Sequence, residues 1–175
     1  MSTFPDPKKF RLVVAGRNEA GEADFLAPGP AAEFDFPGVS AGAFYWAVEG
    51  CHSKTSFGAP PTKVSLAGPN GSTFGVSSFP AHSSGEVDAS TLDESMSATK
   101  DDGDAGMHAS DTIDYEVVIS GKVDLVLPGG KRRTLVPGDL LVMAGVPHAW
   151  KNPYAEDCVY IVVTVGFNTA EGAAA

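Results

Sequence analysis

Between residues 113 and 165 the chain consists of short apolar runs, and each run is bounded by glycine or proline. These two residues interrupt regular structure so often that a long helix has no room. The connectors between the runs have the composition of tight turns: Pro128-Gly129-Gly130, Pro137-Gly138-Asp139 and Gly145-Val146-Pro147. The pattern predicts an all-β, antiparallel meander or barrel. Its predicted strands cover residues 113–120, 122–127, 132–136, 140–143, 148–151 and 158–165.

The first half of the chain adds further predicted strands. Residues 10–15 and 23–27 flank a turn at residues 18–21 and predict a hairpin. No internal repeat is visible, and 175 residues suit one domain of ordinary size better than two. We therefore expect a single domain over residues 1–175, with N-terminal strands supplied by residues 10–79. The other strands predicted in this half cover residues 42–48, 63–66 and 72–79.

Residues 83–105 differ in composition from the rest of the chain. They hold seven acidic side chains against one lysine, and their apolar residues follow no helical or strand period. Such a segment predicts a mobile loop. Two interpretations stay open: a solvated insertion, or a flap over the mouth of a pocket, because the segment leads directly to His108.

The formal net charge of the chain is -10, and no local run of basic residues offsets it. Nucleic acid and anionic membrane surfaces would therefore be repelled. No stretch approaches the roughly 18 apolar residues that a membrane span requires, and the N-terminus lacks the apolar core of a signal peptide. Two cysteines are too few for a disulfide scaffold. We expect a cytoplasmic protein whose partner is a small organic molecule, with no nucleic acid or membrane partner.

Two motifs contain the histidines of the second half. The first reads His108-Ala109-Ser110-Asp111-Thr112-Ile113-Asp114, followed by six residues and Gly121. The second reads Gly145-Val146-Pro147-His148-Ala149-Trp150-Lys151-Asn152 and follows Pro137-Gly138-Asp139. Together they resemble the cupin superfamily, in particular a microbial subgroup of small single-domain cupins. The second motif is intact. In the first, Ser110 stands where the family has a second histidine, and Asp114 where it usually has glutamate.

The resemblance covers about residues 106–166. It implies a β-barrel of the double-stranded β-helix, or jelly-roll, kind, which the upstream strands would complete. It also implies a homodimer, since cupins often pair through an outer face of the barrel.

Strand alternation tests independently whether the motif residues can meet, because side chains two apart share a face. His108, Ser110, Asp114 and Glu116 have one parity, and His148 with Trp150 forms a second row on a later strand. Closure of a barrel would point both rows inward. The residues of the opposite parity, which would face outward, are mostly apolar: Asp111, Ile113, Tyr115, Val117 and Ile119. We therefore expect another layer or a partner subunit to cover this outer face.

The predicted metal ligands are His108, Asp114 and His148. Two imidazoles and one carboxylate form the set that Fe(II) uses while leaving positions open for substrate or oxygen, and Mn, Ni or Zn could be held as well. In the alternative interpretation no metal binds, His108 is a satisfied barrel histidine, and the aspartates cap turns.

Glu116 is the most informative single residue. It has the interior parity and lies in an otherwise apolar strand, where an unpaired carboxylate would cost several kcal/mol of desolvation. Either it pairs with a cation or metal, or it stays protonated and serves as a general acid or base. A bulge that turns its side chain to solvent is the third possibility.

The leading hypothesis is an enzyme of specialised microbial metabolism that uses the barrel cavity for non-redox chemistry, either acid–base or metal-assisted. Dehydration, decarboxylation, isomerisation and cyclisation belong to this class, and the enzyme would be a lyase or isomerase. One alternative is an Fe(II)-dependent dioxygenase, and another is a non-catalytic small-molecule-binding cupin. The candidate catalytic residues are His108, Asp114, Glu116 and His148, and the candidate substrate contacts are Ser110, Trp46, Trp150 and Tyr160.

Overall fold

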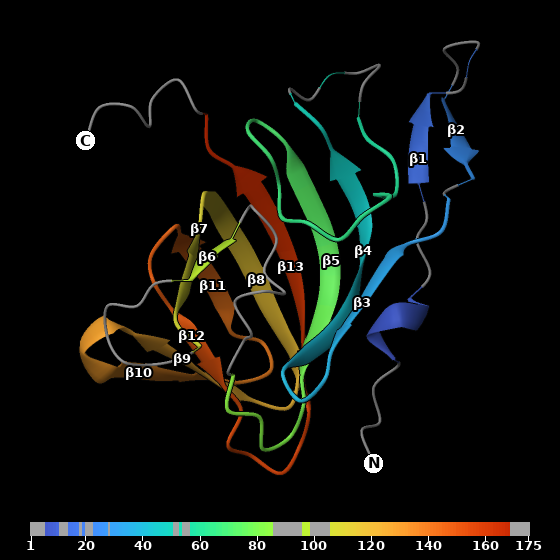
Figure 1. Cartoon of the computed structure of the whole chain (residues 1–175). Coiled ribbons are helices and arrows are strands. Elements are labelled where there is room, and N and C mark those ends of the chain that lie inside the picture. The colour runs from blue at the N-terminus through green and yellow to red at the C-terminus, as the bar shows by residue number, and fades with distance from the viewer. Residues whose placement is uncertain are drawn as a thin grey trace.

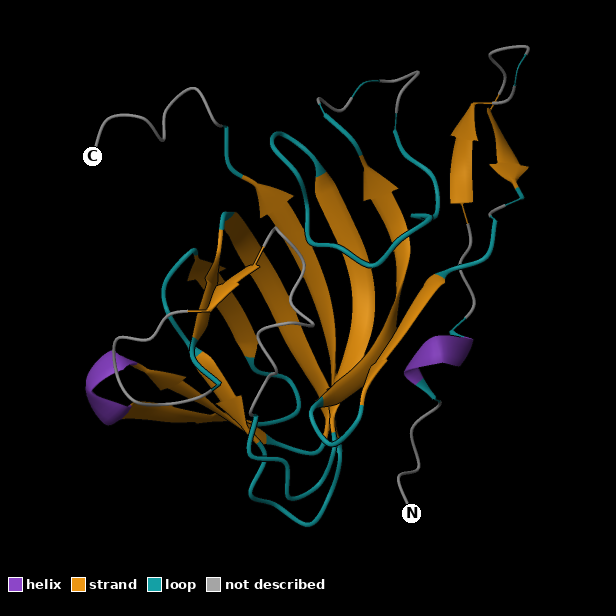
Figure 2. Cartoon of the chain, viewed as in Figure 1, coloured by secondary structure: helices purple, strands orange, loops and turns teal. Residues whose placement is uncertain are grey.

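The computed structural model describes residues 6–10, 14–17, 19, 23–27, 29–50, 53, 57–85, 96–98 and 106–168. Strands dominate this part of the chain, and helix is limited to two short 3-10 turns (Figure 2). None of its helices is long and apolar enough to cross a membrane. The elements are η1 (Pro7–Lys9), β1 (Val14–Arg17), β2 (Ala23–Leu26), β3 (Ala32–Phe36), β4 (Ser40–Val48), β5 (Ser72–Phe79), β6 (Met96–Ala98), β7 (His108–Ser110), β8 (Thr112–Ser120), β9 (Val123–Leu127), η3 (Pro128–Gly130), β10 (Lys131–Leu135), β11 (Leu140–Ala144), β12 (Ala149–Lys151) and β13 (Cys158–Gly166).

A curved six-stranded sheet forms the larger wall of the molecule, in the order β11-β8-β13-β5-β4-β3 (Figure 1). A three-stranded sheet, β10-β9-β12, and the β6-β7 pair form the other side. From β8 to β13 the chain passes back and forth between the two larger sheets, and β3, β4 and β5 from the first half extend the larger one. The fold is the all-β barrel that the sequence predicts.

Most predicted strands are confirmed to within two residues. The β1–β2 hairpin is also present, with Val14 opposite Leu26 and Arg17 opposite Ala23, although most of its predicted turn lies outside the described residues. The short strand β3 was not predicted, because the surrounding passage is rich in proline and glycine.

Two predictions upstream of the motifs are wrong. Residues 63–66 form no strand, although residues 64–66 are partly buried. Val64, Ser65 and Leu66 line a cavity instead, so their apolar character reflects burial rather than ladder pairing. In the predicted loop, Met96–Ala98 forms β6, antiparallel to β7. The hydrogen-bond partners of β6 lie on the neighbouring strand β7. The composition of residues 83–105 alone does not indicate that pairing. Residues 86–95 and 99–105 of that loop lie outside the described residues.

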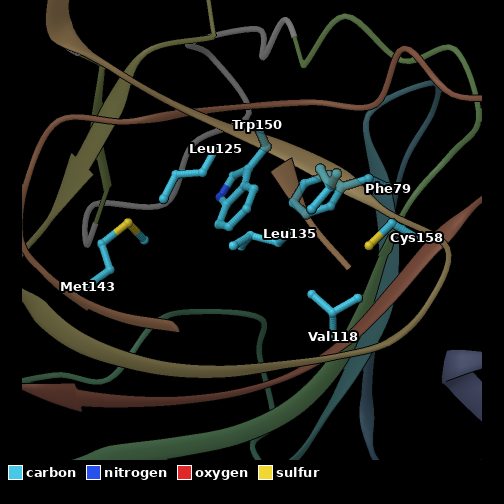
Figure 3. Packing of buried hydrophobic residues seen from close by; sticks show 8 residues of the cluster. Phe79, Val118, Leu125, Leu135, Met143, Trp150 and Cys158 are labelled. Atoms are coloured by element: carbon cyan, nitrogen blue, oxygen red, sulfur yellow. The ribbon is translucent and has the colours of Figure 1, made fainter. Parts of the chain in front are cut away.

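The core between the sheets is built around three stacked rings. Phe79, Trp150 and Tyr160 all contact one another, with ring centroids 5.2 Å apart for Phe79 and Trp150, 5.1 Å for Phe79 and Tyr160, and 6.1 Å for Trp150 and Tyr160. Figure 3 shows Trp150 and Phe79 in the middle of the cluster, which takes side chains from both sheets. The buried cluster therefore ties the motif strand β12 to the larger sheet. Its other members are Val118, Val123, Leu125, Leu135, Met143 and Cys158.

The outer face of the larger sheet is covered only in part. Near η1, the Tyr45 hydroxyl donates to the Pro7 carbonyl at 2.6 Å and accepts from the Phe10 amide at 2.9 Å. At the β8–β11 edge, by contrast, Tyr115 is 47% exposed, Val142 65% and Leu140 76%. The described residues of one chain therefore leave this edge of the outward β8 face largely uncovered.

Candidate functional site

A cavity of about 440 Å³ lies between the walls of the barrel. The part contributed by the two motifs is polar, and the part contributed by the β3–β4 hairpin is aromatic. The polar part is lined by His108, Ser110, Asp114, Glu116, His148 and Thr164, whereas Phe34, Phe36, Phe44 and Leu66 line the apolar part.

His108 and His148 face each other across neighbouring strands. Each backbone amide donates to the other residue's carbonyl at 2.9 Å, and the two ring centroids lie 4.3 Å apart. The Nδ1 atom of His108 lies 3.0 Å from the Gly106 carbonyl, and that of His148 lies 2.9 Å from the Val146 carbonyl. Because a carbonyl only accepts, Nδ1 carries the proton in each ring and Nε2 keeps its lone pair.

Both imidazoles are held neutral. Burial, with a smaller contribution from the neighbouring His108, lowers the pKa of His148 to about 3. The pKa of His108 is also lowered by burial, against an opposing hydrogen bond to Gly106. At neutral pH the cavity therefore presents two unprotonated ring nitrogens, which can accept a hydrogen bond or a proton.

Asp114 and Glu116 lie on β8 with only 6% and 7% of their surface exposed. This confirms the interior parity expected for the strand, and no bulge turns Glu116 to solvent. A hydrogen-bonded chain leads to Asp114: Ser110 Oγ lies 2.8 Å from Thr112 Oγ1, which donates to Asp114 Oδ1 at 2.6 Å. Ser110 thus belongs to the polar lining, as predicted.

No basic side chain accompanies the two carboxyl groups in the described lining of the cavity. Among the described residues that line the cavity, none is lysine or arginine. Burial raises the pKa of Glu116 to about 8, and the nearby Asp114 contributes in the same direction. Burial also raises the pKa of Asp114, while the hydrogen bond from Thr112 lowers it. Glu116 is therefore mainly protonated at neutral pH and can donate a proton.

The predicted metal set is not assembled. In the part of the chain that the structure describes, no three His, Cys, Asp or Glu side chains form a group that could hold a metal ion. His108 lies on β7 and Asp114 on β8, in different sheets, and the Asp114 carboxylate accepts from Thr112. The residues present thus do not fit the three-ligand site that the sequence predicts.

The aromatic candidates divide into two groups. Trp150 and Tyr160 line the cavity as predicted. Trp46 does not: its ring stacks on Phe57 at 5.8 Å and its Nε1 donates to the Phe57 carbonyl at 2.6 Å. The pairing of β4 with β5 shifts register between Phe44 and Trp46, and such an irregularity re-aims the side chains that follow.

Sequence reasoning pointed to Phe44 as a possible wall of an apolar cavity but missed the two aromatic residues that β3 contributes. Phe34 and Phe36 alternate with Glu33 and Asp35, and both acidic residues are exposed. This period of two is the signal that could have revealed β3 and its inward face. Thr164 was missed as well, although its interior parity follows from the prediction of β13.

The comparison with known protein families finds a match over the region that contains both motifs. Residues 99–164 match the model of the cupin domain family. The chain contains a cupin domain. Several solved cupin structures resemble it at low similarity. One is the cupin domain of a transcriptional regulator from Enterobacter cloacae, at 21% identity and a TM-score of 0.35 over 54% of this chain and 80% of that one. Another is a cupin barrel protein from Salinispora arenicola, at 17% identity and a TM-score of 0.37. That comparison covers 63% of this chain and 71% of the other.

Curated relatives of the cupin domain come from fungi. Phomopsin biosynthesis cluster protein C' of Diaporthe leptostromiformis is 46% identical over 50 residues, which are 29% of this chain and 26% of that protein. Oryzines biosynthesis cluster protein J of Aspergillus oryzae is 41% identical over 26% of each chain. A cupin-domain-containing oxidoreductase of Neurospora crassa is 35% identical over 26% of this chain and 24% of that one. The chain thus spans about a quarter of the length of the curated relatives it matches.

Proposed function

We propose that the cupin domain belongs to a small-molecule enzyme of specialised metabolism that carries out non-redox acid–base chemistry in its cavity. Dehydration, decarboxylation, isomerisation and cyclisation are the reactions of this class. The metabolic setting is supported by the relatives named as biosynthesis cluster proteins. The chemistry rests on the residues of the cavity.

The observation that carries the proposal is the position of Glu116. Its side chain is 7% exposed and lines the cavity beside Asp114, with no lysine or arginine among the described lining residues. A buried carboxylate without a cation is strongly disfavoured, so the neutral acid is the stable form. A carboxylic acid that faces a cavity at neutral pH is a proton donor for a bound molecule.

The histidine pair supplies the complementary acceptor. In a dehydration, for example, Nε2 of His148 takes a proton from carbon while Glu116 gives its proton to the leaving hydroxyl, which departs as water. The imidazolium is disfavoured by burial, so its proton passes readily to the Glu116 carboxylate and restores both groups. His108 accepts a hydrogen bond from a second oxygen of the substrate, and the Asp114 charge helps to keep Glu116 protonated.

An Fe(II)-dependent dioxygenase is the competing function, and the Neurospora crassa relative is named an oxidoreductase. Such a site would need a third protein ligand beside His108 and His148, and the described residues bring none to this pair. Oxygen consumption and metal content of the purified protein separate the two functions. Stoichiometric iron that is lost in His148→Ala, together with oxygen uptake, would overturn the acid–base proposal.

The direct test replaces Glu116 by glutamine, which keeps the shape and removes the acid. Turnover of a panel of uncharged hydroxy and carbonyl compounds is followed by mass spectrometry, with Glu33→Gln as the control because Glu33 is an exposed residue of β3. We expect Glu116→Gln to lower kcat/KM by roughly a hundredfold or more, and Glu33→Gln to leave it unchanged. Full activity of Glu116→Gln would contradict the proposal.

A further inference from the structure

The β3–β4 hairpin contributes an aromatic wall that the acid–base chemistry does not use. Phe34 lies with its ring centroid 5.6 Å from Phe36 and 5.7 Å from Phe44, and all three line the cavity. Phe44 is buried, whereas Phe34 and Phe36 are half-buried. Three clustered rings on one side of the cavity offer a flat apolar contact surface to a bound molecule.

Two glycines make room for this wall. Gly42 is paired with Phe34 and Gly75 with Phe44 across neighbouring strands. A Cβ added at Gly42 would lie 3.0 Å from Cζ of Phe34, and one at Gly75 would lie 2.9 Å from Cδ1 of Phe44. The rings therefore lie close against bare backbone. A side chain added at Gly75 would press first on the Phe44 ring, and one added at Gly42 would clash with the backbone of β5 as well as approach Phe34.

The polar side chains of the cavity include no fixed positive charge among the described residues. The lining carries the two neutral imidazoles, the hydroxyls of Ser110 and Thr164, and the carboxyl groups of Asp114 and Glu116. No lysine or arginine among the described lining residues would balance a ligand carboxylate or phosphate. A buried anion would thus meet two acids and no cation, an arrangement that costs several kcal/mol.

We propose that the cavity selects an uncharged, partly aromatic molecule over an anion of the same shape. Its ring system packs against Phe34, Phe36 and Phe44, and its hydroxyl or carbonyl oxygen reaches the polar lining. The inference rests on the proposed function, because it names the substrate class of the same site. A hydroxyl donates to a free Nε2, and a carbonyl accepts from the acid of Glu116. An anionic head group would lose its hydration without gaining a cation among the described lining residues.

Two probes of one shape test the charge preference. 4-Phenylphenol and 4-phenylbenzoate share the biphenyl body and are neutral and anionic at pH 7. Isothermal titration calorimetry with the full chain should give 4-phenylphenol a Kd at least about tenfold lower than that of 4-phenylbenzoate. Equal or tighter binding of the benzoate would overturn the inference.

Two variants test the aromatic wall. Phe34→Leu and Phe36→Leu keep an apolar side chain at half-buried positions, and Phe74→Leu is the matched control because Phe74 is 40% exposed and does not line the cavity. The loss of one ring should raise the Kd of 4-phenylphenol roughly three- to tenfold, with no change in Phe74→Leu. If all three variants bind like the wild type, the wall takes no part in binding and the inference fails.

The outcomes also separate the ligand class from the reaction. Should 4-phenylphenol bind as expected while Glu116→Gln retains full turnover, the proposed function fails and the ligand class stands. If the benzoate binds best while Glu116→Gln abolishes turnover, the ligand class fails and the proposed function stands.

Discussion

At the scale of single residues, Glu116 and His148 place opposite pH limits on the stability of the fold. The pKa of His148 falls from 6.5 to about 3 in the folded chain, so the unfolded chain binds more protons between these values. The pKa of Glu116 rises from 4.5 to about 8, so here the folded chain binds more protons. His108 shifts in the same direction as His148, and Asp114 in the same direction as Glu116.

These shifts predict a stability maximum in mildly acidic solution. Below about pH 4.5 the free energy of unfolding should fall with decreasing pH, because the histidines protonate on unfolding. Above about pH 6.5 it should fall with increasing pH, because Glu116 ionises on unfolding. Each group contributes a slope of at most about 1.4 kcal/mol per pH unit, and between these limits the two slopes oppose each other. Urea denaturation across this pH range measures the profile.

Glu116→Gln should flatten the alkaline side of that profile and leave the acidic side in place. His148→Gln should do the reverse. A wild-type stability that rises steadily from pH 6.5 to pH 8 would show that Glu116 is ionised in the folded chain.

Asn152, the last residue of the second motif, has a structural role. It is fully buried, its Nδ2 donates to the carbonyls of Phe79 and Glu156 at 2.9 Å, and its Oδ1 accepts from the Tyr154 amide at 3.1 Å. Asn152→Ala would leave these buried groups without partners, at a cost of about 1–3 kcal/mol for each group that water cannot reach. Chemical denaturation should therefore show a loss of at least about 2 kcal/mol, and a loss below 0.5 kcal/mol would refute this role.

At the scale of elements, the stacked rings hold β12 to β5 and β13. The rings of Phe79, Trp150 and Tyr160 contact one another, and each of these residues comes from a different strand. Phe79→Ala should lower the free energy of unfolding by about 3–5 kcal/mol. In the control Phe74→Ala, on the outer face of the same strand, the loss should stay below about 1 kcal/mol. Equal losses in thermal or urea unfolding would contradict the assigned packing.

The strands of the second half could be predicted because glycine and proline mark their ends and the parity of β8 separates its two faces. Glu116 was assigned to the interior on that parity alone, and its burial confirms it. Trp46 was misplaced because a register shift in β4 is a property of strand pairing, which one strand's sequence does not contain. β6 was missed for the same kind of reason, since its partner strand supplies its hydrogen bonds. The metal ligands stay a prediction, since the described residues show no group of three that could hold an ion and motif spacing along the chain does not fix distances between strands.

At the scale of the whole molecule, the apolar edge of the larger sheet bears on assembly. β11 is the edge strand, and its exposed Leu140 and Val142 lie beside Tyr115 of β8. An exposed apolar edge strand can pair with a copy of itself in a two-fold arrangement, so the homodimer expected from the sequence would form here.

Light scattering after size exclusion tests this assembly. We expect twice the 18.1 kDa of one chain, and Val142→Asp should shift the protein towards the monomer. A wild-type protein that stays monomeric at high concentration would refute the homodimer.

The central claim is that the cavity holds a protonated Glu116 at neutral pH, and infrared spectroscopy tests it without any substrate. The carbonyl-stretch band of a protonated carboxylic acid should be present in the wild type and in Glu33→Gln at pH 7. The band should diminish as the pH rises through about 8, and it should be absent from Glu116→Gln. A wild-type spectrum without this band at pH 7, or a band that persists unchanged in Glu116→Gln, would contradict the account.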